Sequence, residues 1–471
     1  MYNDYINKIK MIYSQSSDAV FREFVMGNKR CFLFFIDGMV DKTTLEKFLI
    51  QPLMNATGGN IPEEVLPLGE VKTTLELQEA LEAAQSGDSV LVIEGQSEII
   101  IAGTRGFDLR SIGEPQNEAV VIGPKEAFTE GIRNNTSMLR RRIKSPKLVL
   151  KHITAGEFSK TTVVIAYMEG FANKQLVGKI EKKLSSSQIK VLTETAQAER
   201  ALEGNVPSPF PQIITTERPD KVCFSLSRGK VAVIIDGSPF ALILPTKFSE
   251  FFQSPEDHYS RVFAAQSIRL LRKIGAIIAL FAPAIYIAIV SFHPGMLPTQ
   301  LALSIAASRV NVPFPAIVEA LLMELALELL REAGVRLPNP VGQSVGIVGG
   351  IVIGDAAVKA GITSPLMIIV VAITAIASYV IPSYSMSAAF RMLRFAVMII
   401  ASMLGLYGVV LAFIMLIIHL ETLESGGERM LNQNIEGLND MPFYIPKLIF
   451  NEEQEHSKII ENERLMRVWK K

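Results

Sequence analysis

Residues 274–292, IGAIIALFAPAIYIAIVSF, form an apolar run without a charged side chain, and this run decides the fold class. About 20 apolar residues make a helix long enough to cross the hydrocarbon core of a bilayer. Pro283 predicts a kink, because proline has no N–H for the helical hydrogen bond. Arg272 and Lys273 directly precede the run, and cations favour the cytoplasmic end of a membrane helix. The sequence therefore predicts a membrane-spanning helix that begins inside the cell.

Uncharged stretches recur further along the chain, at residues 360–390 and 395–420. The 47 basic and 47 acidic side chains lie mostly before residue 274 and after residue 420. A soluble core could bury one such stretch, but several in one region are typical of a membrane domain. The balanced total charge argues against a nucleic-acid partner. Crossings are predicted at residues 274–292, 316–333, 343–359, 365–382 and 395–420.

The predicted fold class is an α+β soluble N-terminal half, built as two small α/β subdomains, followed by an all-α polytopic membrane domain. The predicted domains are residues 1–145, 146–265, 266–423 and a polar C-terminal tail at 424–471. The first residues, MYNDYINKIKMIYSQ, lack the apolar core of a signal peptide, so the soluble half is expected in the cytoplasm. An odd number of crossings would leave the tail outside. A spanning segment at 297–308, or a flat helix at 316–333, would return it to the cytoplasm.

Four apolar runs in the N-terminal half end in an acid followed by glycine. They are Asp37-Gly38, Glu94-Gly95, Glu169-Gly170 and Asp236-Gly237. Each is interpreted as a strand that enters a tight turn, in which glycine takes a positive φ. The spacing favours a duplication with two such turns in each subdomain, and four unrelated strand ends are the alternative. Turn chemistry explains these acids without catalysis.

Signatures of enzymes, cofactors and metals are missing from the sequence. It contains no GxxxxGK[ST], no GxGxxG after a strand, no HExxH and no GxSxG. The histidines are scattered, and Cys31 and Cys223 are expected to be reduced thiols rather than metal ligands. We therefore predict no catalytic residue, no metal and no cofactor, and a protein that is not an enzyme. Arg140, Arg141 and Arg142 end a predicted helix, either as a solvated end or as a contact with lipid headgroups or a partner subunit.

An acidic helix is predicted at residues 316–333. Its candidate membrane-embedded acids are Glu319, Glu324 and Glu328. Glu324, Glu328 and Glu332 recur every four residues and so form one narrow stripe, with Glu319 roughly opposite. Acids that face lipid would be costly, so these side chains are expected to meet protein, water or the interface. The helix is therefore expected either to lie at the membrane surface or to turn its acids toward an aqueous path or a neighbouring subunit.

The following segment, residues 341–360, reads as a helix with two faces. Its close-packing face carries Gly346, Gly350 and Gly354. The opposite face carries Val341, Val345, Val348, Val352, Asp355 and Lys359. In a ring of such helices the valines and Asp355 would line a central pore that closes by excluding water. Ordinary packing within a bundle is the alternative.

Several motifs resemble those of GerA-type spore germination receptor A subunits. They are SMLRRRI at 137–143, SPFPQ at 208–212, ERPD at 217–220, FQSPED at 252–257 and PFPAIVEALLME at 313–324. The resemblance runs from about residue 17 to about residue 423. It implies a spore inner-membrane protein that assembles with a transporter-like B subunit and a C-subunit lipoprotein. It also implies an oligomeric, nutrient-gated channel that releases monovalent cations, which supports the pore hypothesis for Val345, Val348 and Val352.

Two departures and two alternatives accompany the resemblance. The tail after Glu424 lacks the aromatic-proline pattern expected of the family, and Asp355 stands where a neutral residue is expected. A related branch, the sporulation-stage V paralogue of the A subunit, shares these motifs and would act as an accessory channel. A transporter-like subunit that binds the nutrient itself, through Glu319 or Glu324 at a helix break, is the other alternative. A scaffold that only docks the other subunits is a further one.

Overall fold

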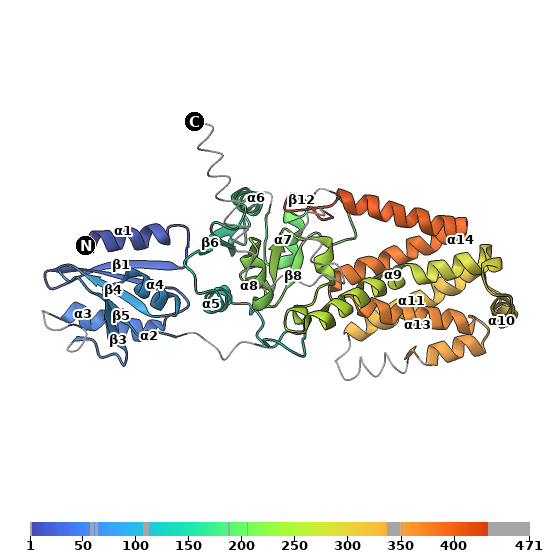
Figure 1. The fold of residues 1–471 in the computed structure, drawn as a ribbon, viewed down its shortest axis with the longest axis horizontal. Helices are drawn as coiled ribbons and strands as arrows, with labels where there is room; N and C mark the ends of the chain where they lie inside the picture. The colour runs from blue at the N-terminus through green and yellow to red at the C-terminus, as the bar shows by residue number, and fades with distance from the viewer. Residues whose placement is uncertain are drawn as a thin grey trace, which may run out of the picture. The chain divides into compact units, whose positions relative to one another are not determined.

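A computed structural model gives the fold, and it describes residues 2–56, 61, 65–106, 113–186, 189–204, 206–336, 349–350 and 352–431. The chain divides into two compact units. We refer to Met1–Glu250 with Met415–Met430 as the α/β unit, and to the part within Phe251–Ile414 as the helical unit. Figure 1 labels most of their helices and several of their strands.

The α/β unit begins with a five-stranded antiparallel sheet of order β1-β2-β4-β5-β3. Its strands are β1 (Ala19–Met26), β2 (Lys29–Ile36), β3 (Val71–Thr74), β4 (Ser89–Ile93) and β5 (Ile99–Ala102). One face packs on α1 (Tyr2–Ile12) and α4 (Leu77–Gln85). The other face packs on the π-helical turn η1 (Leu45–Ile50) and α3 (Gln51–Asn55), and the short helix α2 (Lys42–Thr44) directly precedes η1. Because alternate residues of β2 point to opposite faces, the apolar run KRCFLFFI feeds both cores.

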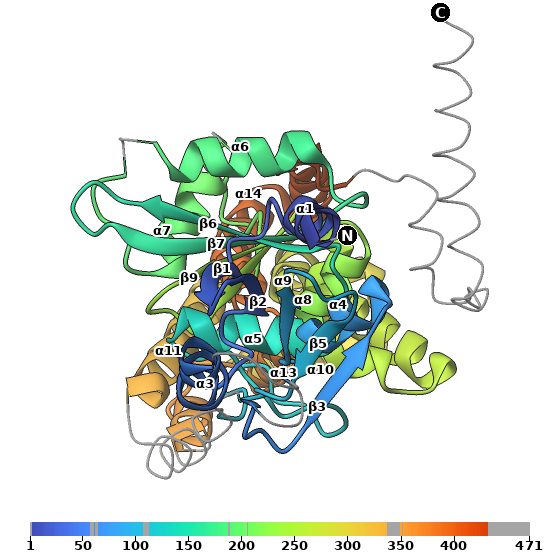
Figure 2. The same ribbon diagram turned by 90° about the vertical axis from the view of Figure 1, so that its left-hand side faces the viewer.

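A second sheet repeats this arrangement with the order β6-β7-β9-β10-β8. Its strands are β6 (Leu148–Ala155), β7 (Thr161–Met168), β8 (Ile214–Thr216), β9 (Val231–Ile235) and β10 (Ala241–Leu244). Helices α6 (Lys174–Leu184) and α7 (Thr195–Leu202) cover one face (Figure 2). Helices α5 (Ile132–Arg142) and α8 (Pro219–Ser227) contact the sheet as well. The two sheets therefore share one strand order relative to the chain, as a duplication requires.

The four acid-glycine pairs lie at equivalent places in the two sheets. They follow β2 and β4 in the first sheet, and β7 and β9 in the second. The four glycines have φ between +83° and +87°, a conformation that strains any residue with a Cβ atom. The predicted turns and the predicted α+β fold class are confirmed.

The helical unit contains α9 (Val262–Phe292), α10 (Thr299–Arg309), α11 (Ala316–Arg336), a helical segment at 352–359, α13 (Pro365–Tyr379) and most of α14 (Tyr384–Thr422), whose residues from Met415 onward belong to the α/β unit. Short 3-10 turns accompany them at η3 (Phe248–Phe252), η4 (Pro255–His258) and η5 (Pro294–Met296). In the described part of the chain, α9 and α14 are long and apolar enough to cross a membrane. Pro283 lies inside α9, and the helix continues past it.

The last apolar run differs from its prediction as one span, because Gly405 breaks α14 with φ 62° and ψ −143°. We call residues 384–404 the first arm and residues 406–422 the second arm. The bend is tight: a Cβ atom on Gly408 would lie 2.6 Å from the carbonyl oxygen of Ile400. After the second arm, β11 (Glu424–Ser425) and β12 (Glu428–Arg429) form a short hairpin that belongs to the α/β unit.

Candidate functional site

Glu319 joins three helices of the helical unit. Its side chain is fully buried, and it forms an ion pair with Arg309 of α10 at 2.8 Å. Its other carboxylate oxygen accepts a hydrogen bond of 3.0 Å from the backbone N–H of Ser364, the residue that caps α13. A buried carboxylate needs such partners, because burial removes its hydration. Glu319 therefore ties the end of α10 and the start of α13 to α11.

Glu324 pairs with Arg394 of the first arm at 2.6 Å, and both side chains are at most 1% exposed. Arg394 also donates from Nε to the carbonyl oxygen of Ala279 at 2.6 Å. Pro283 lies four residues after Ala279 and has no N–H, so this carbonyl loses its helical donor. Arg394 takes over that role and so connects α9, α11 and α14. Within the described residues, one oxygen of Glu324 and one nitrogen of Arg394 have no hydrogen-bond partner.

Glu328 lies one turn further along α11 and faces two arginines. It pairs with Arg331 at 2.7 Å and with Arg391 of the first arm at 3.4 Å. The guanidinium of Arg331 lies 5.1 Å from the ring centre of Tyr379, at the end of α13. The next acid of the stripe, Glu332, is 65% exposed and pairs with Arg336 on its own helix. The stripe therefore runs from the inside of the bundle to its surface.

The two innermost acids of α11 meet protein in this chain, since Glu319 is buried against an arginine of α10 and Glu324 against an arginine of α14. A position of the helix at the membrane surface, or acids toward an aqueous path or a neighbouring subunit, stays a prediction. The sequence held one usable signal. Glu324 and Glu328 are separated by one turn, and so are Arg391 and Arg394, so two antiparallel helices bring the pairs into register.

The glycine and valine segment is described only in part. Val341, Val345, Gly346 and Val348 lie outside the described residues. Val352 is 57% exposed, and Asp355 forms a 2.7 Å pair with Lys359 while both remain more than half exposed. These three positions share one face of the helix, since they are spaced three and four residues apart.

The two predicted packing glycines in the described part have different surroundings. A Cβ atom on Gly354 would lie 3.9 Å from Ile368 of α13, whereas Gly350 borders open space within 4 Å. One predicted packing glycine therefore does lie beside a neighbouring helix. The face with Val352, Asp355 and Lys359 is left uncovered in a single chain.

Helix α5 holds the two sheets of the α/β unit together. Arg140 forms a 2.7 Å pair with Asp18, and both side chains are at most 4% exposed. Arg133 pairs with Asp37, the first of the acid-glycine acids. Asp236, the last of them, accepts from the N–H of Ile132 at the start of α5 at 3.2 Å. These turn acids therefore also position a helix.

The basic end of α5 is largely paired within this unit, and Arg141 and Arg142 stay partly exposed. Arg140 is buried, and Arg142 pairs with Glu126 of the preceding loop. Burial raises the pKa of Asp37, but Arg133 and Lys42 outweigh that effect and lower it overall. An ionised Asp37 is thus favoured, as the contact with α5 requires.

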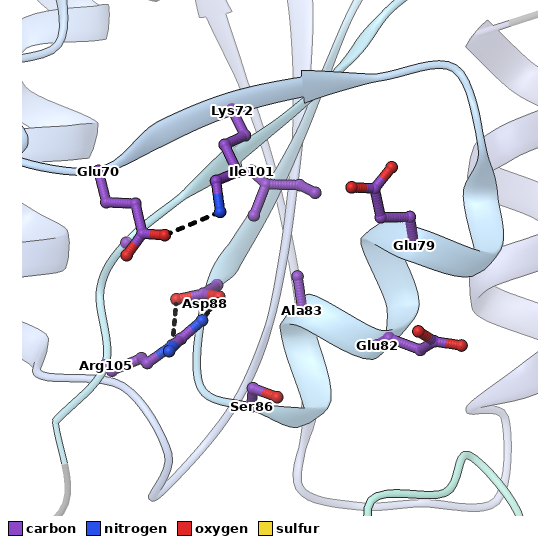
Figure 3. Close-up of a pocket in the computed structure, with 10 residues that line it drawn as sticks. Glu70, Lys72, Glu79, Glu82, Ala83, Ser86, Asp88, Ile101 and Arg105 are labelled. Atoms are coloured by element: carbon purple, nitrogen blue, oxygen red, sulfur yellow. Dashed lines mark hydrogen bonds and ion pairs between the residues drawn. The ribbon is translucent and has the colours of Figure 1, made fainter.

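A shallow pocket of about 230 Å³ lies in the first subdomain, between α4, β3 and β5 (Figure 3). Its charged side chains are Glu70, Lys72, Glu79, Glu82, Asp88 and Arg105. Arg105 pairs with Asp88 at 2.7 Å, and Lys72 pairs with Glu70 at 3.0 Å. Throughout the described ranges, no three His, Cys, Asp or Glu side chains are placed to hold a metal ion. Two ion pairs therefore account for four of these six charged side chains.

Comparison with known proteins gives long matches. Residues 7–451 match the family described as Bacillus/Clostridium GerA spore germination protein. The chain is 40% identical to spore germination protein KA of Bacillus subtilis (strain 168) over 455 residues, which cover 94% of this chain and 84% of that protein. It is 44% identical to spore germination protein A1 of the same organism over 381 residues, or 79% of each chain.

Two further similarities concern a membrane protein and a solved structure. The chain is 38% identical to the uncharacterized membrane protein YfkQ of Bacillus subtilis (strain 168), over 90% of this chain and 84% of that one. Among solved structures, the N-terminal domain of the A subunit of the Bacillus megaterium spore germinant receptor GerK3 is 30% identical, with a TM-score of 0.39. That match covers 52% of this chain and 94% of the solved chain.

Proposed function

The chain belongs to the GerA family of spore germination proteins, and from this premise we propose that it is the A subunit of a nutrient-responsive germination receptor. The match over nearly the whole chain carries this proposal. The family is one of germination proteins rather than of enzymes. The expected partners are a transporter-like B subunit and a C-subunit lipoprotein, and the expected place is the inner membrane of the spore.

Contacts at helix ends support a multi-pass arrangement of the helical unit. Gly361 follows the helical segment at 352–359, and a Cβ atom on it would lie 3.0 Å from the carbonyl oxygen of Asn311, shortly before α11. Arg331 near the end of α11 contacts the ring of Tyr379 at the end of α13. The helical segment at 352–359 therefore runs antiparallel to α11, and α13 runs parallel to α11.

The two arms of α14 complete this alternation. Gly405 lies beside Phe292 at the end of α9, since a Cβ atom on Gly405 would be 3.1 Å from that ring. We infer crossings by α9, α11, the segment that ends at residue 359, α13 and each arm of α14. This number is even, so both ends of the helical unit meet the same side of the membrane. Residues 415–430 accordingly belong to the same compact unit as the residues before 251.

The uncovered face at Val352, Asp355 and Lys359 supports a channel formed by several copies. A charged pair that faces lipid is costly, whereas a water-filled axis between subunits hydrates it. In a ring of subunits, the predicted stripe of Val341, Val345 and Val348 would extend to Val352 and Asp355. These side chains would line and narrow a pore for monovalent cations. Nutrient-dependent release of those cations would then start germination.

Electron microscopy of the purified receptor tests this proposal. A closed ring with Val352 and Asp355 facing its axis is the expected result. A single copy per complex, or a ring in which both residues face lipid, would contradict the channel and leave the family assignment intact. Nutrient binding to the purified chain without its partners would instead favour the transporter-like alternative, in which this subunit holds the nutrient itself.

A further inference from the structure

The end of α14 and the hairpin after it are embedded in the second sheet subdomain. Leu423 and Ser425 are fully buried, and Met430 is 1% exposed. We refer to the contact between the two parts as the α14 joint. On the subdomain side it consists of Leu176, Ser208, Phe210, Thr246 and Phe248, and on the α14 side of His419, Leu423, Ser425, Gly426 and Met430.

Two hydrogen bonds donated by backbone N–H groups join the hairpin to the segment after β10. The N–H of Thr246 donates to Oγ of Ser425 at 2.9 Å, and the N–H of Phe248 donates to the carbonyl oxygen of Met430 at 3.0 Å. Thr246 in turn accepts from the N–H of Ile214 in β8 at 3.2 Å through its own hydroxyl. The hairpin is therefore linked to the edge of the sheet and not only to a loop.

The SPFPQ segment makes the second contact, directly on the helix. Oγ of Ser208 lies 2.8 Å from Nε2 of His419, in the last turns of α14. The N–H of Phe210 donates to the same Oγ at 3.1 Å, and the hydroxyl keeps a second lone pair and its own hydrogen, so it can bond either tautomer of the histidine ring. The Phe210 ring is buried, and its centre lies 6.2 Å from that of His419.

The two glycines in the turn of the hairpin allow it to approach α6 closely. Gly426 and Gly427 have φ of 62° and 91°, the two positive values that a type I′ hairpin turn needs. A Cβ atom on Gly426 would lie 2.7 Å from Leu176 of α6. The sequence SGGE therefore allows the hairpin to touch α6.

We propose that the α14 joint transmits a change in the second sheet subdomain to the second arm of α14, with Ser208 and His419 as its positioning residues. The partly buried Ser208–His419 contact and the buried Thr246–Ser425 hydrogen bond join this end of the helix and its hairpin to the subdomain, so that they move with it. At the other end, the positive φ of Gly405 separates the two arms, so the second arm can tilt while the first stays in place. This inference rests on the receptor role of the family and does not need the channel.

The test measures germination of spores that carry the complete receptor, at graded nutrient concentrations. The variants are S208A, H419A and the double variant, with receptor abundance in the spore membrane measured by immunoblot. Each single variant should raise the nutrient concentration for half-maximal germination by roughly three- to tenfold, the factor that one hydrogen bond supports. The double variant should shift it no further than the larger single shift, because both remove the same contact.

H152A is the matched control, because His152 is an exposed histidine of the same sheet. It should leave the response unchanged. H419Q keeps a hydrogen-bonding group and should recover most of the response if H419A accumulates poorly. Additive shifts in the double variant, an unchanged response at equal abundance, or an H419Q protein that is abundant yet as insensitive as H419A would each overturn the proposal.

Discussion

Arg394 donates a hydrogen bond of 2.6 Å to the carbonyl oxygen of Ala279, the carbonyl that Pro283 deprives of its helical donor. A proline inside an apolar helix thus creates an acceptor, and an arginine from another helix fills it. The same guanidinium neutralises Glu324. The Arg394 side chain therefore supplies a partner both for the carbonyl of Ala279 and for the carboxylate of Glu324, two buried groups that would destabilise the fold if left unpaired.

Replacing Arg394 should destabilise the helical unit strongly. R394A leaves Glu324 buried without a cation, and breaking a buried pair in this way costs about 3–5 kcal/mol. The thermal unfolding of the detergent-solubilised chain should therefore shift to lower temperature. The double variant E324L/R394L should recover much of the loss, because neither charge of this pair then remains buried, and the Ala279 carbonyl alone stays without its donor. R336A, which removes an exposed pair, is the control and should change little.

The Arg140–Asp18 pair should matter for the joining of the two sheets. R140A leaves Asp18 buried and unpaired, and we expect a loss of about 3 kcal/mol or more in the free energy of unfolding of the α/β unit. Hydrogen exchange of β1 and β6 should rise together, since α5 connects both sheets. K8A, which removes an exposed pair on α1, should leave exchange in both strands unchanged. Equal hydrogen exchange in R140A and K8A would show that the Arg140–Asp18 pair does not stabilise the contact between the two sheets.

Shortening the side chain at position 352 should loosen the proposed constriction. V352A makes the axis wider and less apolar, so water and cations enter more easily. Spores with V352A should lose monovalent cations without nutrient, as measured by ion release into the medium. I353A on the same helix changes a residue that lies off this face and should retain its ions. Ion retention in V352A equal to that of the unaltered spores would remove Val352 from the pore.

Labelling from the two sides of the membrane should place the C-terminal hairpin with the α/β unit. In a chain whose own cysteines are replaced, the cysteine of E428C should react from the same side as the cysteine of V121C, since Glu428 and Val121 are both exposed. The cysteine of M296C, in the turn after α9, should react from the other side. Reaction of E428C and M296C from one side would contradict the even number of crossings.

Glu199 predicts a pH dependence within the α/β unit. Burial, and then the nearby carboxylate of Glu203, raise the pKa of Glu199 to about 7. Because this value lies above that of the unfolded chain, about 4.3, the folded state binds more protons between these pH values. The free energy of unfolding that the protonated Glu199 contributes is fully present below about pH 4. It is lost as the pH rises to about 7, by an amount on the order of 3 kcal/mol.

The matched variant for this effect is E199Q, which keeps the side chain neutral at every pH. Hydrogen exchange of α7 should increase between about pH 5 and about pH 7.5 in the unaltered chain, after correction for the intrinsic rate. E199Q should abolish that increase. An increase of the same size in E199Q would show that Glu199 does not titrate in this range.

Much of the fold followed from local patterns. The acid-glycine turns were predicted because positive φ is a property of one residue, and the apolar runs because burial and bilayer length act on contiguous sequence. The break at Gly405 was missed within the last run. A glycine inside an apolar stretch has the same composition whether the helix continues or turns, and only the packing against α9 decides it.

The sequence by itself determined that an α/β half precedes an apolar helical half, and that acids recur every turn on α11, whereas the duplication followed from the shared strand order of the two sheets. It did not determine what those acids face. Arg394 lies 70 residues from Glu324, and Ser425 lies 179 residues from Thr246. Such contacts depend on which helix or strand edge becomes the neighbour, and that is decided by the burial of whole elements rather than by any local preference. The tertiary structure therefore decided which charges are paired, and where the end of α14 is held.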